Sequence, residues 1–193
     1  EAELVRCSLA VIVRSNQAAV ILRDRAGPIT GLDKFHRVLN GRDHNLFKPR
    51  SIGGRSNIRQ MIDVDESAFL IIYVGSLGGK YCITEMLDLF SYIVSSNPNA
   101  RLIVLSNQFE LMNSALEGFP DIAHLVIVDC VSEEKVIDYV READLGLGLI
   151  RASFSMKAVS AIKYGEYLLS GVPVIATSGI GDIAELSNES VYL

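Results

Sequence analysis

The residues best suited to chemistry lie on one helix-like segment near the end of the chain. Glu166 is a carboxylate among Tyr, Leu and Ser residues. Because a charge beside an apolar core must be paired or bound to a ligand, this glutamate is a candidate binding residue. Lys163 lies three positions earlier, so the two side chains share one helix face. The two residues either serve a ligand or form an ordinary salt bridge of small energy.

A glycine-rich turn offers a second kind of chemistry, the binding of phosphate. Residues 75–80, GSLGGK, follow an expected strand and precede an expected helix. Glycines let a backbone approach a diphosphate closely, and a helix amino terminus supplies N–H groups and a positive dipole. The turn is not a Walker A motif, because Tyr81 stands where that motif requires Ser or Thr. A tight turn that carries a solvated lysine is the alternative interpretation.

Five apolar strands are expected to position these residues. They lie at 69–74, 102–105, 125–128, 145–149 and 172–176, with amphipathic segments between them. Among the expected helices, one is capped by Ser15 and runs through Ile21, one has Glu133 and Glu134 in its first turn, and one spans 157–170. Continuous hydrophobicity is typical of strands buried on both faces. The alternation predicts an α/β fold with a doubly wound, Rossmann-like parallel sheet and right-handed crossovers. Ligands of such sheets bind at the carboxyl ends of the strands, where we expect Glu166 and the glycine-rich turn.

Composition narrows the class of protein. The chain of 193 residues is 49% hydrophobic, and its apolar runs are strand-sized, well short of the ~18 residues of a membrane span. The net charge of −5 argues against a general nucleic-acid binder. Cys7, Cys82 and Cys130 are too widely spaced for a zinc site or a disulfide framework, and they favour the reducing cytoplasm. The missing initiator Met and the strand-like end predict a fragment cut at both ends.

Two motifs carry a resemblance to a known family. Residues 166–176, EYLLSGVPVIA, resemble the carboxyl-terminal half of group 1 (family 4) glycosyltransferases of the GT-B fold. Residues 38–49, VLNGRDHNLFKP, resemble the interdomain segment P-N-G-V-D-x-x-x-F-x-P of that family, with Val38-Leu39 where Ile-Pro is usual. The resemblance implies a remnant of the amino-terminal acceptor domain at 1–39, an interdomain linker at 40–60, and a nucleotide-sugar-binding domain at 61–193 that is truncated at its carboxyl end.

The resemblance also implies a function. It is the retaining transfer of a hexose from a nucleotide sugar to a saccharide acceptor, such as a growing glycan or a lipid-linked saccharide, in polysaccharide biosynthesis. No cofactor or bound metal is expected, because the helix dipole and cationic side chains offset the charge of the leaving diphosphate. The full-length enzyme is expected in the cytoplasm, with peripheral association at the inner face of the membrane. The fragment alone is expected to be inactive, because most of the acceptor domain precedes residue 1.

Within this resemblance Glu166 grips the ribose hydroxyls of the donor. The donor-binding residues expected from the sequence are Glu166, Lys163, Gly75, Ser76, Gly78, Gly79, Lys80, Ser155 and Lys157. No catalytic residue is assigned. The chain departs from the family pattern at three places: Ser76 stands in place of an Arg, Lys80 lies one residue early, and Ala158 replaces the first acid of the E-x7-E motif.

Other functions are compatible with the same sequence. One is another GT-B enzyme, such as a sugar-nucleotide epimerase, and another is a non-catalytic relative. A third is a nicotinamide- or ligand-binding Rossmann module, since residues 179–184, GIGDIA, match G-x-G-x-x-A. That motif belongs at the start of a βαβ unit, whereas here it lies near the end of the chain. It is therefore either a rim loop whose amide groups face a donor or a plain turn.

Overall fold

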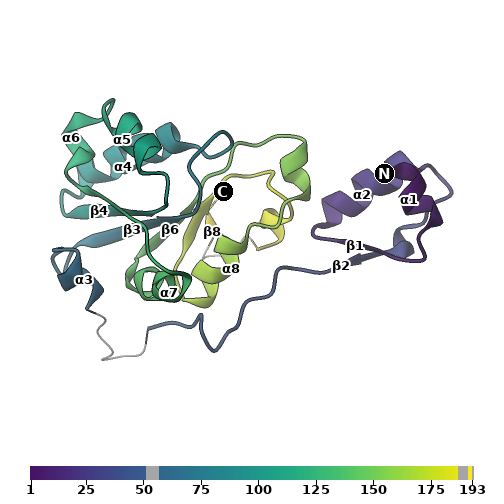
Figure 1. Cartoon of the computed structure of the whole chain (residues 1–193), viewed down its shortest axis with the longest axis horizontal. Helices are drawn as coiled ribbons and strands as arrows, with labels where there is room; N and C mark the ends of the chain where they lie inside the picture. The colour runs from purple at the N-terminus through teal and green to yellow at the C-terminus, as the bar shows by residue number, and fades with distance from the viewer. Residues whose placement is uncertain (51–56, 187–190, 193) are drawn as a thin grey trace.

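The computed structural model describes residues 1–50, 57–186 and 191–192. The larger sheet has the strand order β5-β4-β3-β6-β7-β8, and every neighbouring pair is parallel (Figure 1). Its strands are β3 (Phe69–Val74), β4 (Ala100–Leu105), β5 (Val126–Asp129), β6 (Leu145–Gly148), β7 (Val174–Ala176) and β8 (Val191–Tyr192). All five strands expected from the sequence belong to this sheet, so the predicted parallel α/β fold is confirmed.

The strand order reverses beside β3. The chain moves outward through β4 and β5, returns to β6 on the other side of β3, and then continues to β7 and β8. This is the topology of a doubly wound sheet, and its switch point lies between β3 and β6. A crevice opens at the carboxyl ends of the strands at such a point, because the following loops leave toward opposite faces of the sheet.

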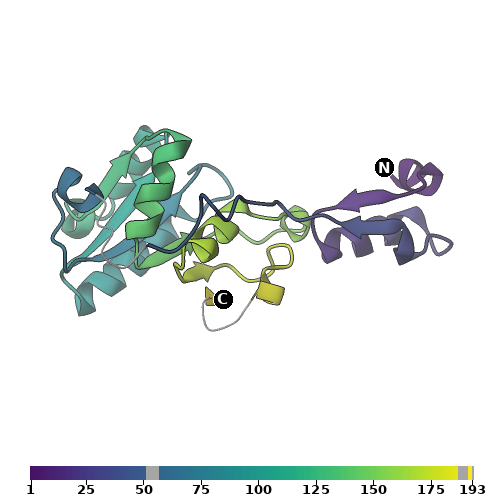
Figure 2. The same ribbon diagram turned by 90° about the horizontal axis from the view of Figure 1, so that it is seen from below.

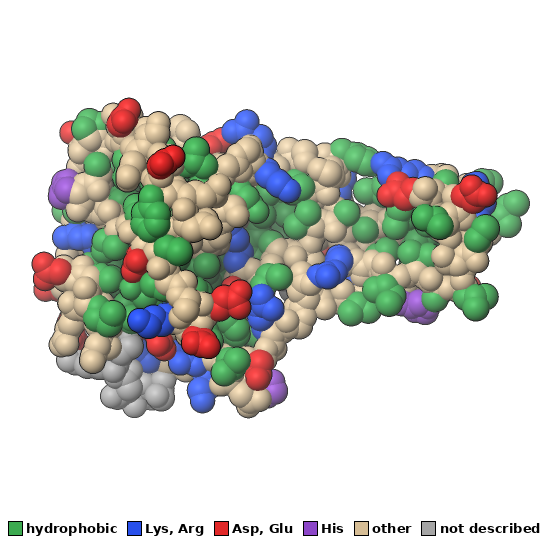
Figure 3. All heavy atoms as spheres, viewed as in Figure 1, with side chains coloured by type: hydrophobic (Ala, Val, Ile, Leu, Met, Phe, Trp, Pro, Cys, Tyr) green, Lys and Arg blue, Asp and Glu red, His purple; other side chains and the backbone are tan. Residues whose placement is uncertain are grey.

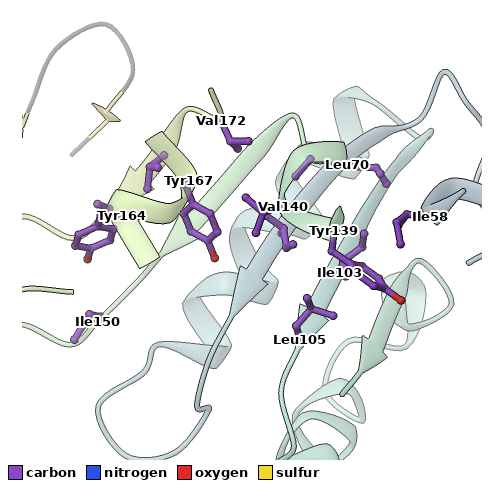
Figure 4. Packing of buried hydrophobic residues seen from close by; sticks show 14 of the residues in the cluster. Ile58, Leu70, Ile103, Leu105, Tyr139, Val140, Ile150, Tyr164, Tyr167 and Val172 are labelled. Carbon is purple, nitrogen blue, oxygen red and sulfur yellow. The ribbon is translucent and has the colours of Figure 1, made fainter. Parts of the chain in front are cut away.

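Helices cover both faces of this sheet (Figures 1 and 2). One face packs against α4 (Ile83–Ser96), α5 (Phe109–Leu116) and α6 (Pro120–Ala123), and the other against α3 (Ile58–Met61), α7 (Glu133–Glu142) and α8 (Ile162–Leu169). Alternate residues of β3 belong to the two cores: Ile71 and Tyr73 to the first, Leu70 and Ile72 to the second. Figure 4 shows Leu70 in the second core together with Ile103 of β4 and Val140 of α7. Burial on both faces explains why the strand is apolar at every position.

The amino-terminal residues form a smaller parallel sheet of their own. Its strands β1 (Val11–Val13) and β2 (Phe35–Arg37) accompany α1 (Ala2–Cys7), α2 (Asn16–Ala26) and the 3-10 turn η1 (Leu32–Lys34). Ser15 caps α2 as predicted, since its Oγ accepts from the N–H of Ala18 at 3.0 Å. The helix runs to Ala26, beyond the expected end at Ile21, and α1 was not predicted.

The first turn of α2 joins this smaller sheet to the larger part of the chain. Ser15 donates to the carbonyl of Lys157 at 3.0 Å, and the N–H of Asn16 donates to Asp182 at 2.7 Å. Arg37 of β2 pairs with the same Asp182 at 2.9 Å and with Glu185. A carboxylate at a helix amino terminus is stabilised by the helix dipole, so Asp182 suits this place.

Residues 38–50 contain no helix or strand and lie against the larger part of the chain (Figure 1). Asn40 donates to the carbonyl of Ser160 at 2.8 Å, and Arg141 of α7 donates to the carbonyls of Leu46 and Lys48. Acidic and basic side chains lie side by side where this segment crosses α7 and α8 (Figure 3). We call residues 40–50 the linker segment; that it joins two domains, with the boundaries given above, stays a prediction.

Close packing of α8 on β6 depends on two glycines. A Cβ on Gly146 would lie 2.6 Å from the ring of Tyr167, and one on Gly148 would lie 2.0 Å from the ring of Tyr164. Both tyrosines are buried, and the hydroxyl of Tyr164 donates to the carbonyl of Gly148 at 2.8 Å. These contacts fix the position of α8 relative to the sheet.

We therefore expect Gly148→Ala to destabilise the fold by about 1–3 kcal/mol, because the added methyl group overfills the contact with Tyr164. The control is Gly165→Ala on α8 itself, where a Cβ would meet no atom within 4 Å. Since alanine favours helix over glycine by about 0.5–1 kcal/mol, this variant is expected to gain stability. Urea denaturation measures both. Equal stability changes in the two variants would contradict the packing argument.

Candidate functional site

Two adjoining cavities open at the carboxyl ends of β3, β4 and β5. The first, of about 490 Å³, lies between residues 41–47 of the linker segment and the first turns of α7, and Glu166 lines it. The second, of about 360 Å³, lies beside residues 74–76 and 105–107 and the loop at 130–131. Val74, Glu133 and Val136 line both cavities, so we treat them as one groove. The groove lies at the edge of the sheet where the topology predicts a ligand.

Glu166 reaches the groove from α8. The helix is anchored to β3 as well as to β6, because the N–H of Val74 donates to the hydroxyl of Tyr167 at 2.9 Å. The Glu166 side chain is 13% exposed, and its Oε1 accepts from Nε of Arg42 at 2.7 Å. A half-buried carboxylate therefore lines the groove with one oxygen held by Arg42, while its other oxygen accepts no hydrogen bond from the described residues.

Lys163 carries a buried ammonium group. Among the described residues its Nζ finds no hydrogen-bond partner. It lies 4.0 Å from the ring centroid of Tyr73 and 5.3 Å from that of Tyr81, and these rings offer cation–π attraction. Burial lowers the pKa of Lys163 to about 8, against the opposing effect of Glu166. The site thus holds a positive charge close to a core with no hydrogen-bonded counter-charge, which is an unstable arrangement unless an anion arrives.

The glycine-rich turn begins close to that ammonium. Gly75 has φ +131, and a Cβ added to it would lie 3.3 Å from Nζ of Lys163. The backbone conformation therefore favours glycine, and a Cβ here would also crowd the end of the lysine side chain. The turn is held by the hydroxyl of Tyr73, which donates to the carbonyl of Ser76 at 2.5 Å, and by the N–H of Leu77, which donates to Gln108 at 2.6 Å.

The structure brings some of the expected residues together and leaves others apart. Glu166, Gly75 and Ser76 line the groove, and Lys163 lies beside Gly75. Gly78, Gly79 and Lys80 follow in the same turn but do not line either cavity, and Lys80 is exposed. After Ser76 the chain turns away from the groove, because Tyr81 forms a β-bridge with Ile150 before α4 begins.

Ser155 and Lys157 lie away from the groove, on the short 3-10 turn η2 (Ser155–Ala158). Both side chains are exposed. The helix expected to start at Lys157 begins only at Ile162, so that sequence prediction was wrong at its amino end. The backbone between residue 157 and the start of α8 is bonded to other segments. Ser15, which caps α2, donates to the carbonyl of Lys157, and Asn40 of the linker segment donates to the carbonyl of Ser160.

The glycine motif at 179–184 is a structural turn. Gly181 has φ +48, and a Cβ on it would lie 1.8 Å from the carbonyl oxygen of Val159. Its N–H donates to the carbonyl of Met156 at 2.9 Å. Because this amide is already bonded within the chain, the motif does not present it to a dinucleotide or to a donor, and the plain-turn interpretation applies at Gly181.

The sequence did not single out Arg42, Glu133 or Glu134 as groove residues. The two glutamates were expected only as acids in the first turn of α7, which they are. The signal for Arg42 was its place in residues 38–49, where the resembled motif has Val. Within the described part of the chain, no group of three or more His, Cys, Asp and Glu residues is arranged to hold a metal ion, and no helix is long and apolar enough to cross a membrane.

No protein-family model matches the chain, and no curated protein matches it in sequence. Solved structures do resemble it. A glycosyltransferase of Rickettsia africae ESF-5 has a TM-score of 0.75 at 13% identity, over 98% of this chain and 51% of that protein. HepE of Anabaena, solved with UDP and glucose, has a TM-score of 0.73 at 18% identity, over 98% of this chain and 50% of HepE.

Sucrose-phosphate synthase of Thermosynechococcus elongatus is similar as well, with a TM-score of 0.71 at 16% identity over the whole of this chain and 46% of the synthase. The chain thus spans about half the length of these proteins. These proteins share their architecture with the chain. This architecture agrees with the fold that the resemblance in sequence implied. The chain therefore has the GT-B fold of these glycosyltransferases, and it matches about half of each of them.

Proposed function

We propose that the groove binds a nucleotide sugar and that the chain is the donor-binding part of a retaining glycosyltransferase acting on a saccharide acceptor. The observation that carries the proposal is the joint position of Glu166 and Lys163. A hydrogen-bond acceptor and a cation that has no hydrogen-bond partner among the described residues lie three positions apart on α8, at the carboxyl ends of the sheet and beside a glycine turn. Ribose hydroxyls and a diphosphate are the groups that this pair of charges fits.

The parts of the donor follow from the chemistry of the groove. The diphosphate lies at Gly75 and Ser76, where the Lys163 ammonium supplies positive charge. The ribose lies at Glu166, whose carboxylate accepts from vicinal hydroxyls. HepE, which shares the fold, was solved with UDP and with UDP-glucose, and this supports a nucleoside diphosphate sugar as the donor class.

Lys163 has a role in the transfer itself. When the bond between the anomeric carbon and the diphosphate breaks, negative charge grows on the phosphate oxygens. A preorganised cation in a site of low polarity stabilises that charge more than water does. The proposal includes no bound metal. Two further statements stay predictions. The chain alone is expected to be inactive, and the full-length enzyme is expected to work in the cytoplasm at a membrane.

A nicotinamide-binding function has less support. It relied on the glycine motif at 179–184, and Gly181 there is bonded within the chain. A sugar-nucleotide epimerase on the same fold would use the same donor site, so the donor experiments below apply to it equally. Measured sugar transfer to a saccharide acceptor distinguishes the transferase from the epimerase.

Replacing Glu166 by Ala is expected to weaken nucleotide-sugar binding by about tenfold or more, because two ribose hydroxyls lose a charged partner and each such bond is worth roughly 1.5–3 kcal/mol. Glu166→Gln is expected to lose less, since the amide oxygen still accepts. Calorimetry with UDP, GDP and ADP sugars measures the effect. Glu185→Ala is the control, because that glutamate pairs with Arg37 outside the groove. If Glu166→Ala binds the donor as tightly as the parent does, this glutamate is a helix-surface acid with no part in donor binding.

Lys163 makes donor binding dependent on pH. The free protein holds the pKa of Lys163 at about 8 through burial, and a bound diphosphate raises it. Affinity for UDP is therefore expected to fall between about pH 7 and 9, because an increasing share of Lys163 is deprotonated and binding then requires uptake of a proton. In Lys163→Met the affinity is weaker and does not change over this range.

The stability of the ligand-free protein provides a second measurement. The ordinary pKa of lysine is 10.5, above its value in the folded chain. The unfolded chain therefore binds more protons between pH 8 and 10.5, and this group's contribution makes stability rise with pH there. Lys163→Met is expected to melt at a higher temperature than the parent at pH 7, with the difference shrinking by pH 10.5. Lys157→Met, which changes an exposed lysine, is the control; a loss of stability at pH 7 in Lys163→Met would contradict the account.

A further inference from the structure

Arg42 contacts the proposed ribose-binding carboxylate from the linker segment. Its Nε–H donates to Oε1 of Glu166 at 2.7 Å, across a separation of 124 positions in sequence. The Arg42 side chain is 33% exposed and that of Glu166 is 13% exposed. The bond uses one N–H and one oxygen, so Oε2 of Glu166 accepts no hydrogen bond from the described residues. The carboxylate is thus held at one oxygen while the other is open to a ligand.

The linker segment presents Arg42 from a fixed backbone. Before it, Asn40 donates to the carbonyl of Ser160 at 2.8 Å. After it, the carbonyl of Asp43 accepts from the N–H of Phe47 at 2.9 Å. The Asp43 carboxylate accepts two hydrogen bonds from Asn45, at 2.8 and 3.0 Å, and these lower the pKa of Asp43. Asp43 is therefore engaged locally, and the Arg42 guanidinium goes to Glu166.

The charges of the groove explain why such a cation is needed. Glu133, Glu134 and Glu166 all line the same cavity, and a nucleoside diphosphate brings further negative charge. Without Arg42, Glu166 would face two other carboxylates and an anionic ligand with only the attraction of the buried Lys163 to offset them, which is unfavourable. Arg42 also lines this cavity and supplies the compensating charge.

This contact is a departure of the chain from the pattern that residues 38–49 resemble. That pattern has N-G-V-D where the chain has Asn40-Gly41-Arg42-Asp43. A valine side chain has no hydrogen-bond donor, so the contact with Glu166 depends on the arginine at position 42. The geometry can serve either of two purposes: to orient the carboxylate or to occupy it until a ligand displaces the arginine. The free Oε2 favours the first, because a single N–H leaves room for hydroxyl groups.

We propose that Arg42 is a positioning residue, which holds Glu166 so that its carboxylate faces the vicinal hydroxyls of a ribose. The inference rests on the proposed function, because it needs a nucleotide in the groove. It assigns Arg42 to the recognition of the sugar diol, so its loss reduces the preference for ribose over 2′-deoxyribose. A purely structural contact would weaken both kinds of nucleotide alike.

The test is calorimetry of the parent, Arg42→Met and Arg42→Lys with UDP, GDP and ADP and with their 2′-deoxy counterparts. For the nucleotide that the parent binds, we expect about a tenfold preference for the ribose form, the value of one charge-assisted hydrogen bond. Arg42→Met is expected to reduce this preference to about threefold or less through weaker binding of the ribose form, with little change for the deoxy form. Arg42→Lys keeps the charge and is expected to restore part of the preference.

Two further variants separate this role from others. Arg141→Met loosens the same linker segment without removing a cation from Glu166, because Arg141 binds the carbonyls of Leu46 and Lys48. It should keep the full ribose preference. In Glu166→Ala, adding Arg42→Met should cause no further loss, since the two residues act through one carboxylate.

Each contrary outcome has its own meaning. Tighter binding by Arg42→Met would show that the arginine competes with the ligand, and an equal loss in Arg141→Met would attribute the effect to linker docking. If Glu166→Ala loses the ribose preference and Arg42→Met keeps it, the proposed function stands and the role of Arg42 fails. If the parent binds none of the six nucleotides, the proposed function fails, and the role of Arg42 with it.

Discussion

A lysine ammonium buried without a hydrogen-bonded counter-charge is the constraint on which the site depends. Folding has to remove Lys163 from water at a cost that the aromatic rings of Tyr73 and Tyr81 only partly offset. A chain that needed stability alone would place a neutral residue there. We propose that an anion compensates this charge from the groove, which Gly75 lines beside the lysine. The lowered pKa of Lys163, about 8, expresses the same cost.

The rest of the larger sheet serves to hold this charge in place. The groove opens at the carboxyl ends of β3, β4 and β5, and the glycines of β6 allow the tyrosines of α8 to pack directly on the strand. Those tyrosines anchor α8 to both strands through their hydroxyl groups. Glu166 therefore lines the groove from an anchored helix, Lys163 lies behind Gly75 on the same helix, and Arg42 contacts Glu166 from the linker segment. A preorganised cation is most effective for a developing negative charge when its surroundings do not have to move.

Local patterns in the sequence predicted the parts that depend on local physics. The five strands were visible because burial on both faces makes each of them continuously apolar, and the cap of α2 was visible because Ser15 bonds its own helix. Glu166 and Lys163 stood out as charges on an apolar helix. Arg42 was missed because its partner is 124 positions away. Ser155 and Lys157 were expected in the site as polar groups near Ala158, where the resembled E-x7-E motif has its first acid, whereas α8 begins only at Ile162 and both side chains are exposed.

The central claim is that the Lys163 ammonium is reserved for an anionic ligand, and its titration is the most direct measurement. Side-chain NMR of the protein labelled at lysine, recorded from pH 6 to 11 with and without a nucleoside diphosphate, gives the pKa of this one group; Lys163→Met assigns its signal. The account predicts a pKa near 8 in the free protein and a rise of about one unit or more on binding, the direction that a nearby opposite charge imposes. An ordinary lysine pKa in the free protein, or no change when the nucleotide binds, would contradict it.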